Sequence, residues 1–304
     1  MKGYYPEGKS GVDAGQKNYT LAQLQEATVS REILEATAYM CDSDHNLLVN
    51  LGGMKGVIPR VEGAIGIADG STRDIAIISR VGKPVCFTVE EISHDTQGRP
   101  YALLSRKKAQ ELCKEDFISK LVPGDVIDAK ITHLESFGAF CDIGCGNVAL
   151  LPIDSISVSR ISHPSDRFIG GDDIKVIVKG IDPAGRITLS HKELLGTWQE
   201  NADRFSPGDT VSGVVRSIES YGIFVELAPN LAGLAEPKEG VKVGQTAGVY
   251  IKSIISEKMK VKLIIIDSFN EGAPKPYEYF FKGNHIDRFI YSPPSSGKNI
   301  ETIF

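Results

Sequence analysis

The feature that most constrains the fold of this chain is an internal repeat with an offset of 84 residues. Segments 123–125 (PGD) and 136–140 (SFGAF) recur as segments 207–209 (PGD) and 220–224 (SYGIF), at the same offset. Self-similarity at a fixed spacing marks a repeated structural unit. The chain is therefore expected to fold as tandem copies of one small domain.

A weaker copy precedes these two. Residues 49–52 (VNLG) resemble residues 141–144 (CDIG), and residues 56–59 (GVIP) resemble residues 149–152 (ALLP). The sequence thus predicts three repeats. The expected organisation is an N-terminal arm with a short helix (1–30), a degenerate first repeat (31–105), a linking helix (106–121), a second repeat (122–190), a second linking helix (191–204), a third repeat (205–267) and a C-terminal tail (268–304).

Each repeat is predicted to form five short strands. In the second repeat these are segments 126–131, 139–143, 148–151, 175–178 and 186–189, which are alternating or apolar runs separated by turn residues. Five short strands suit a closed barrel, because closure leaves no unpaired strand edge. The predicted fold class is mainly β: three tandem five-stranded barrels joined by short helices, with a short C-terminal hairpin tail.

Capping patterns place helices between the barrels. Residues 20–23 form a capping box before the first repeat, and Ser105 can cap a helix that runs toward Leu121. Residues 190–193 form another box, which predicts a helix carrying Trp198. In the tail, residues 277–291 are predicted to form the hairpin, with its aromatic side chains packed on the third repeat. The alternative is that these side chains are extra stacking sites.

Composition sets limits on the class of protein. The chain has 41% hydrophobic and 24% charged residues, as is typical of soluble globular proteins. No apolar run is long enough for a transmembrane helix, and the first residues lack the apolar core of a secretory signal, so a cytoplasmic location is expected. The net charge of −5 argues against attachment to phosphates by bulk charge.

Nothing in the sequence indicates catalysis. The five cysteines are odd in number, which argues against a disulfide framework. Cys141 and Cys145 are four positions apart, but no second Cys or His pair with zinc spacing accompanies them. We therefore expect a non-enzymatic protein without a metal or a cofactor.

The repeated aromatic block is the strongest candidate binding surface. Phe137 and Phe140, like Tyr221 and Phe224, are three positions apart with a glycine between them. Residues three apart lie on opposite faces of an unbroken strand, but a glycine permits a bulge that brings both rings to one side. Exposed rings would stack bases at about 1–3 kcal/mol each. The alternative is that the rings fill a core, and their recurrence at matching positions favours the surface.

The turn at residues 181–186 is a second candidate. Asp182 opens the turn and Arg186 begins the next strand, where its guanidinium could contact a phosphate or stack on a base. The alternative is a turn aspartate with a solvated arginine. In the third repeat Lys260 takes the place of the arginine. The positive charge is kept, but the planar guanidinium with its forked donors is lost.

These blocks resemble the S1 (S-one) RNA-binding domain, a five-stranded OB-type barrel. Its motifs are a Gly-Asp opening, a Phe-Gly-x-Phe block, a block with a histidine, and a close of the form D-x-x-G-R-i-x-L-S. The second repeat matches three of them, at 124–125, 137–140 and 182–190. The resemblance implies a nucleic-acid-binding face made by Phe137, Phe140, Asp182 and Arg186 in the second repeat and by Tyr221, Phe224 and Lys260 in the third.

The repeats depart from the family pattern unequally. The family histidine is Pro152 in the second repeat and Glu236 in the third. The first repeat has His45 and Leu48 where the aromatic residues belong, so strong RNA binding is not expected there. Segment 52–59 resembles the leading repeats of the small-subunit ribosomal protein, which in that family tend toward ribosome docking. We treat docking by the first repeat as a hypothesis.

The function implied is that of a non-enzymatic protein of the translation apparatus that binds single-stranded RNA, including mRNA, and that has no membrane or small-molecule partner. The small ribosomal subunit is a further expected partner, through the first repeat. The alternative is an adaptor whose barrels bind protein partners, with RNA binding incidental. The acidic net charge and the lost histidines favour the adaptor, and a barrel fold by itself does not decide between them.

Overall fold

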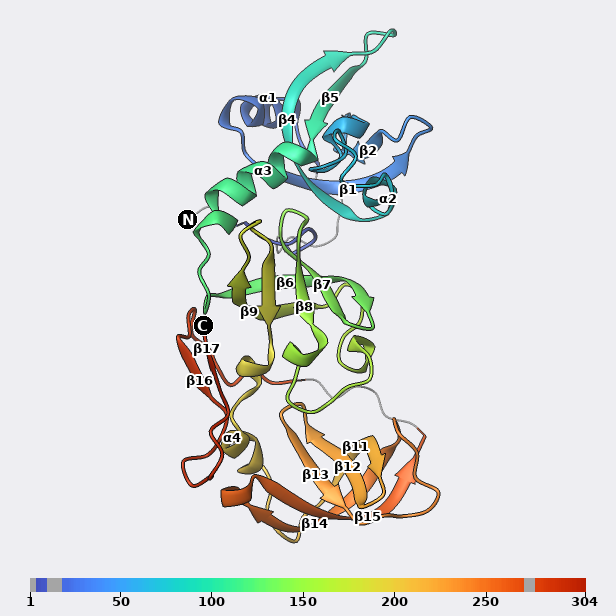
Figure 1. The fold of residues 1–304 in the computed structure, drawn as a ribbon. Coiled ribbons are helices and arrows are strands. Elements are labelled where there is room, and N and C mark those ends of the chain that lie inside the picture. Colours follow the sequence, from blue (N-terminus) through green and yellow to red (C-terminus); the bar gives the residue numbers. More distant parts are fainter. Residues whose placement is uncertain (1–3, 10–17, 271–276) are drawn as a thin grey trace. The chain divides into compact units, whose positions relative to one another are not determined.

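The computed structural model describes residues 4–9, 18–270 and 277–304, which form three closed five-stranded barrels (Figure 1). The chain divides into two compact units. The first comprises residues 1–121, 128–130 and 142–148, and the second comprises residues 122–127, 131–141 and 149–304. The predicted fold class is confirmed.

The three barrels share one topology. Barrel 1 has the strand order β1-β2-β3-β5-β4, and barrel 3 has the equivalent order β11-β12-β13-β15-β14. In each barrel the third and fifth strands pair in parallel, and the fourth and fifth strands pair antiparallel. The strands are β1 (Leu34–Cys41), β2 (Leu47–Asn50), β3 (Lys55–Ile58), β4 (Pro84–His94) and β5 (Pro100–Ser105) in barrel 1, β6 (Val126–Glu135), β7 (Gly138–Gly144), β8 (Asn147–Pro152), β9 (Asp173–Ile181) and β10 (Ile187–Ser190) in barrel 2, and β11 (Thr210–Glu219), β12 (Gly222–Ala228), β13 (Leu231–Ala235), β14 (Thr246–Ile255) and β15 (Lys260–Phe269) in barrel 3.

Strand alternation separates a core from an outer face in each barrel. Along β15, Val261, Leu263 and Ile265 are buried, whereas the residues between them are exposed. The inward residues pack with those of the other strands, such as Val225 of β12 and Val249 of β14. Burial of these apolar side chains drives barrel closure. The outward residues remain available for contacts with other molecules.

The first two predicted helix starts are confirmed. Thr20 caps α1 (Leu21–Ser30) with a complete capping box, and the Ser105 hydroxyl accepts a hydrogen bond from Lys108 N at the start of α3 (Arg106–Asp116). Shorter helical turns are α2 (Ile75–Ile78), η1 (Arg60–Glu62), η2 (Ile118–Lys120), η3 (Ile153–Ser155), η4 (Pro164–Asp166) and η6 (Ser256–Lys258). None of the helices in the described ranges has the length and apolar character needed to cross a membrane.

The link after barrel 2 differs from the prediction. Ser190 does not cap a continuous helix, and its hydroxyl instead bonds the Glu193 carboxylate at 2.5 Å. The link consists of η5 (Lys192–Leu195) and α4 (Trp198–Ala202), separated by Gly196 at a φ of 85°. A left-handed glycine ends the first turn, and Thr197 then caps the second helix with its own capping box.

The tail also differs from the prediction. Its hairpin is formed by β16 (Arg288–Ile290) and β17 (Glu301–Ile303), not within residues 277–291. The predicted packing on barrel 3 is confirmed for Phe289 and Tyr291, which are buried in its core. The aromatics upstream lie elsewhere: the Tyr279 hydroxyl lies 3.3 Å from His191 Nε2, and the Tyr277 ring contacts both His191 and Phe168. The tail therefore packs on both barrels of the second unit.

A buried ion pair joins barrels 2 and 3 within the second compact unit. Glu226 of β12 accepts two hydrogen bonds from Arg167, at 2.7 and 2.9 Å, and one from Arg216 Nε at 2.8 Å. Arg167 lies in segment 155–170, which has no counterpart in the third repeat. A bidentate arginine fixes the orientation of a carboxylate. The extra residues of the second repeat thus position the third barrel.

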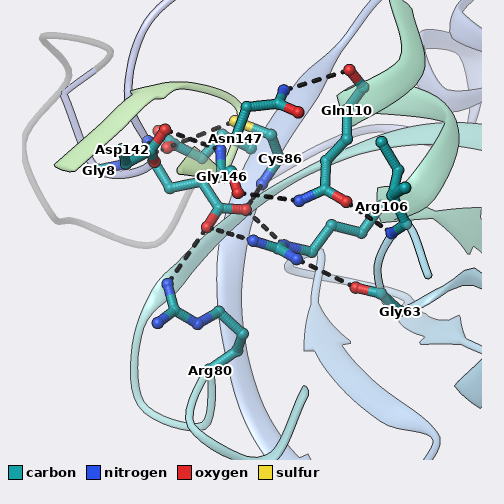
Figure 2. A network of polar contacts seen from close by, with 12 residues as sticks. Gly8, Gly63, Arg80, Cys86, Arg106, Gln110, Asp142, Gly146 and Asn147 are labelled. Atoms are coloured by element: carbon teal, nitrogen blue, oxygen red, sulfur yellow. Dashed lines mark hydrogen bonds and ion pairs between the residues drawn. The ribbon is translucent and has the colours of Figure 1, made fainter. Parts of the chain in front are cut away.

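A second buried polar network lies in the first compact unit (Figure 2). Glu7 receives hydrogen bonds from Arg106 at 2.6 and 2.9 Å, and its backbone N–H donates to Asp142 at 2.8 Å. Burial alone raises the pKa of the Glu7 carboxyl, but the guanidinium groups of Arg106 and Arg80 outweigh burial and lower it. Glu7 therefore stays charged and holds the N-terminal arm against α3 and the β7–β8 turn.

Acid should destabilise the second unit through His191. Burial, together with the positive charge of the nearby Arg167, lowers the pKa of this imidazole to about 4. In the unfolded chain this histidine protonates near its ordinary pKa of about 6.5. Because the unfolded chain takes up a proton that the folded protein does not, unfolding becomes more favourable as the pH falls from about 6.5 to 4. We expect a loss of about 3 kcal/mol in the free energy of unfolding over that interval, measured by chemical denaturation.

The variant His191→Gln should lose this part of the pH dependence, while His94→Gln, at an exposed site in barrel 1, should keep it. A His191→Gln protein with the same pH dependence as wild type would contradict the assignment to this side chain.

Candidate nucleic-acid interface

The aromatic pair of barrel 2 lies at the surface. Phe137 is 53% exposed in the turn before β7, and Phe140 is half-buried on β7. Their ring centroids are 6.0 Å apart with an interplanar angle of 88°. This edge-to-face arrangement holds one ring against the other and leaves the Phe137 face open to a planar ligand. The alternative in which both rings fill the core is wrong.

Barrel 3 repeats this geometry. Tyr221 is 65% exposed before β12, and Phe224 is half-buried on that strand. The Tyr221 and Phe224 centroids are 6.2 Å apart with an interplanar angle of 90°. The agreement between the two pairs shows that the sequence repeat is also a repeat of side-chain geometry.

Close backbone approach explains the glycine in each block. A Cβ at Gly138 would lie 2.5 Å from the carbonyl oxygen of Leu151, and a Cβ at Gly222 would lie 2.6 Å from that of Ala235. In barrel 3 the predicted bulge is not at the glycine. In barrel 3 the pairing register shifts on the neighbouring strand β11, at Arg216. The first ring of each pair precedes its strand, so strand alternation does not apply to it.

The turn between β9 and β10 is organised by its aspartate. Asp182 accepts hydrogen bonds from the backbone N–H groups of Ala184 and Arg186, and from Arg186 Nε at 2.6 Å. The bonds from Arg186 are the main reason why the pKa of Asp182 is lowered. Arg186 is 84% exposed, so Asp182 orients a guanidinium that remains accessible to solvent. Asp182 is thus a turn residue that supports Arg186.

Three of the predicted residues line one groove in barrel 3. Tyr221, Phe224 and Lys260 border a depression of about 460 Å³ that runs over β12, β13 and β15. Two further lysines, Lys252 and Lys262, also line it. A groove that combines stacking rings with ammonium groups has the chemistry of a single-stranded nucleic-acid site. Glu236, at the position of the family histidine, lies on the same groove.

Two residues at these surfaces were missed from the sequence. The His133 ring stacks on Phe140 with centroids 6.4 Å apart, and its Nε2 lies 2.7 Å from the Glu135 carboxylate. His133 lies on β6, outside the repeated block, and Ser217 stands at the equivalent position in the third repeat. Lys252 was missed because it lies on β14, far from the motif that contains Lys260. In both cases the signal is strand pairing, which local motifs do not show.

Barrel 1 lacks an aromatic pair at the equivalent positions. Asp74, at the start of α2, binds Arg60 at 2.7 and 3.1 Å and lies 3.7 Å from His45. Leu48, in place of the second ring, is buried. The segment between β3 and β4, which contains Arg60 and Asp74, therefore lies against His45, where barrels 2 and 3 have an exposed aromatic ring.

Comparisons with known proteins identify relatives of this chain. Residues 120–192 match the family model described as S1 RNA binding domain. Small ribosomal subunit protein bS1 of Staphylococcus aureus (strain COL) is 32% identical over 267 residues, which cover 82% of this chain and 65% of that protein. The bS1 protein of Leuconostoc lactis is 29% identical over 276 residues, covering 85% and 61%. The chain thus spans less than two thirds of the length of these relatives.

Two solved structures also match parts of this chain. A multidomain protein with nucleic acid binding domains from Streptococcus pneumoniae TIGR4 is 14% identical, with a TM-score of 0.26 over 78% of this chain and 73% of that one. GSP13 from Bacillus subtilis is 28% identical, with a TM-score of 0.22 over 23% of this chain and 55% of that one.

Gly138→Ala should destabilise barrel 2, because its new methyl group collides with the Leu151 carbonyl. We expect a loss of about 1–3 kcal/mol in the free energy of unfolding, measured by denaturant titration. Gly180→Ala is the matched control, because no heavy atom lies within 4 Å of a Cβ built there. Equal stability of the two variants would show that the close approach does not explain the glycine.

Proposed function

We propose that this chain, which resembles proteins built from S1 RNA-binding domains, binds single-stranded RNA by stacking bases on the aromatic pairs of barrels 2 and 3. The observation that carries the proposal is the recurrence of an exposed edge-to-face pair at the same place in both barrels. In barrel 3 the pair opens onto a groove lined by three lysines. Stacking on rings accepts any base, so low sequence specificity is expected.

The ligand we propose is mRNA, and the setting is translation. The relatives are named small ribosomal subunit protein bS1, which supports a role beside the ribosome in the cytoplasm. Arg186 and Lys260 would contact the RNA backbone, with Asp182 holding Arg186 in place. Binding and positioning of a strand need no catalytic step, so we propose no enzymatic activity.

Removing either aromatic pair should weaken RNA binding. Because each stacked base contributes about 1–3 kcal/mol, Phe137→Ala/Phe140→Ala and Tyr221→Ala/Phe224→Ala should each lower affinity for labelled single-stranded RNA about tenfold or more. Fluorescence anisotropy at low salt measures the change. Tyr39→Ala is the control, because Tyr39 is an exposed aromatic residue on barrel 1. Unchanged affinity in both double variants would rule out stacking.

A second candidate function is protein docking by barrel 1. The segment that covers its face exposes four apolar side chains: Val61, Ile75, Ile78 and Val81. A cluster of exposed apolar residues is typical of a surface that contacts another macromolecule. We propose that this segment docks on the small ribosomal subunit, so that barrels 2 and 3 can take the RNA.

Ile75→Glu/Ile78→Glu should abolish co-sedimentation of the whole chain with small ribosomal subunits, because two carboxylates replace exposed apolar contacts. The point variants keep the hydrogen bonds between Glu7 and Arg106, which a deletion of residues 1–105 would remove. Tyr221→Ala/Phe224→Ala serves as the comparison, since it alters RNA binding alone. Undiminished co-sedimentation of the isoleucine variant would contradict docking by this segment.

A further inference from the structure

All three barrels carry a β-bulge at the same place in the fourth strand. In barrel 1 the register of β4 against β5 skips one residue between Val89 and Glu91. In barrel 3 the register of β14 against β15 skips one residue between Ile251 and Ser253. In barrel 2 the shift falls at Thr188 and Leu189, and it skips one residue of β9. The skipped residues are Glu90, Lys179 and Lys252.

The bulge residue lies on the outer face of barrels 2 and 3. Lys252 follows the buried Ile251, and Lys179 follows the buried Val178, so both side chains are turned away from the core. In barrel 3, Lys252 is exposed and lines the groove together with Tyr221 and Phe224. In barrel 2, Lys179 is also exposed, and its ammonium donates a hydrogen bond to Ser155 Oγ at 3.0 Å.

The charge at the bulge differs in barrel 1. Glu90 is held there by the ammonium of Lys108 and by the Thr88 hydroxyl, which donates to it at 2.8 Å. Barrel 1 is also the barrel whose aromatic positions are His45 and Leu48. A lysine therefore accompanies each aromatic pair, and a glutamate stands where the pair is missing.

We propose that the bulge residue selects which barrels accept RNA. Lys252 and Lys179 each contact a backbone phosphate next to a stacked base, and Glu90 repels phosphate from barrel 1. This inference rests on the proposed RNA binding, and it adds residues that the repeated motifs do not contain. An ammonium is a compact charge with three hydrogen-bond donors on a flexible stem. It can therefore contact a phosphate without restricting which base is stacked beside it. A local contact of this kind suits a chain whose net charge is −5.

Salt dependence tests the proposal. The binding constant for single-stranded RNA falls with salt at a slope of about 0.7 per neutralised phosphate on logarithmic axes. Lys252→Glu in the whole chain should lower affinity at low salt and reduce that slope by about 0.7. Lys242→Glu carries the same charge change at another exposed site of barrel 3, and it should leave the slope close to wild type.

The outcomes separate this inference from the proposed function. Tyr221→Ala/Phe224→Ala should weaken binding while keeping the slope, because it removes stacking and no charge. If that variant weakens binding but Lys252→Glu and Lys242→Glu behave alike, the bulge lysine has no special role and RNA binding stands. If neither the aromatic variants nor Lys252→Glu changes affinity, or if wild type binds no RNA, both proposals fail.

Discussion

Closure of each five-stranded sheet is the constraint on which the rest of the structure depends. A closed barrel turns one face of every strand into a core, so the binding chemistry has to come from outward residues and from turns. Val261, Leu263 and Ile265 fill the core of barrel 3, while Lys260 and Lys262 alternate with them outward. The strands that carry the core thus also present the groove.

Closure also explains why the site depends on irregularities. A regular strand would send residues three apart to opposite faces. The first ring of each pair avoids this because it precedes the strand, and Gly138 or Gly222 lets the strand pass within van der Waals reach of a facing carbonyl. Lys252, the residue skipped in the register of β14 against β15, lines the same groove. Backbone irregularity, rather than composition alone, assembles the site.

Charge is divided between structure and surface. Arg106 and Arg167 are buried against Glu7 and Glu226, where bidentate pairing keeps the carboxylates ionised and orients whole segments. These arginines hold the fold, and they are not available to a phosphate. The exposed cations beside the rings of barrel 3 are lysines, and in barrel 2 Arg186 is held out to solvent by Asp182. Under the proposed function, local contacts would thus let an acidic protein bind RNA without attracting it from a distance.

The sequence alone determined the number of repeats, the barrel class, the surface position of the aromatic pairs and the turn at Asp182, because these follow from local spacing and alternation. It predicted a single helix after Ser190 and a hairpin at 277–291, and both were wrong, because Gly196 and the contacts of Tyr279 with His191 override local preference. Only the tertiary structure decided the roles of Lys252, His133 and Asp74. Their neighbours are distant in sequence, and strand register, including a bulge of one residue, determines which side chains meet.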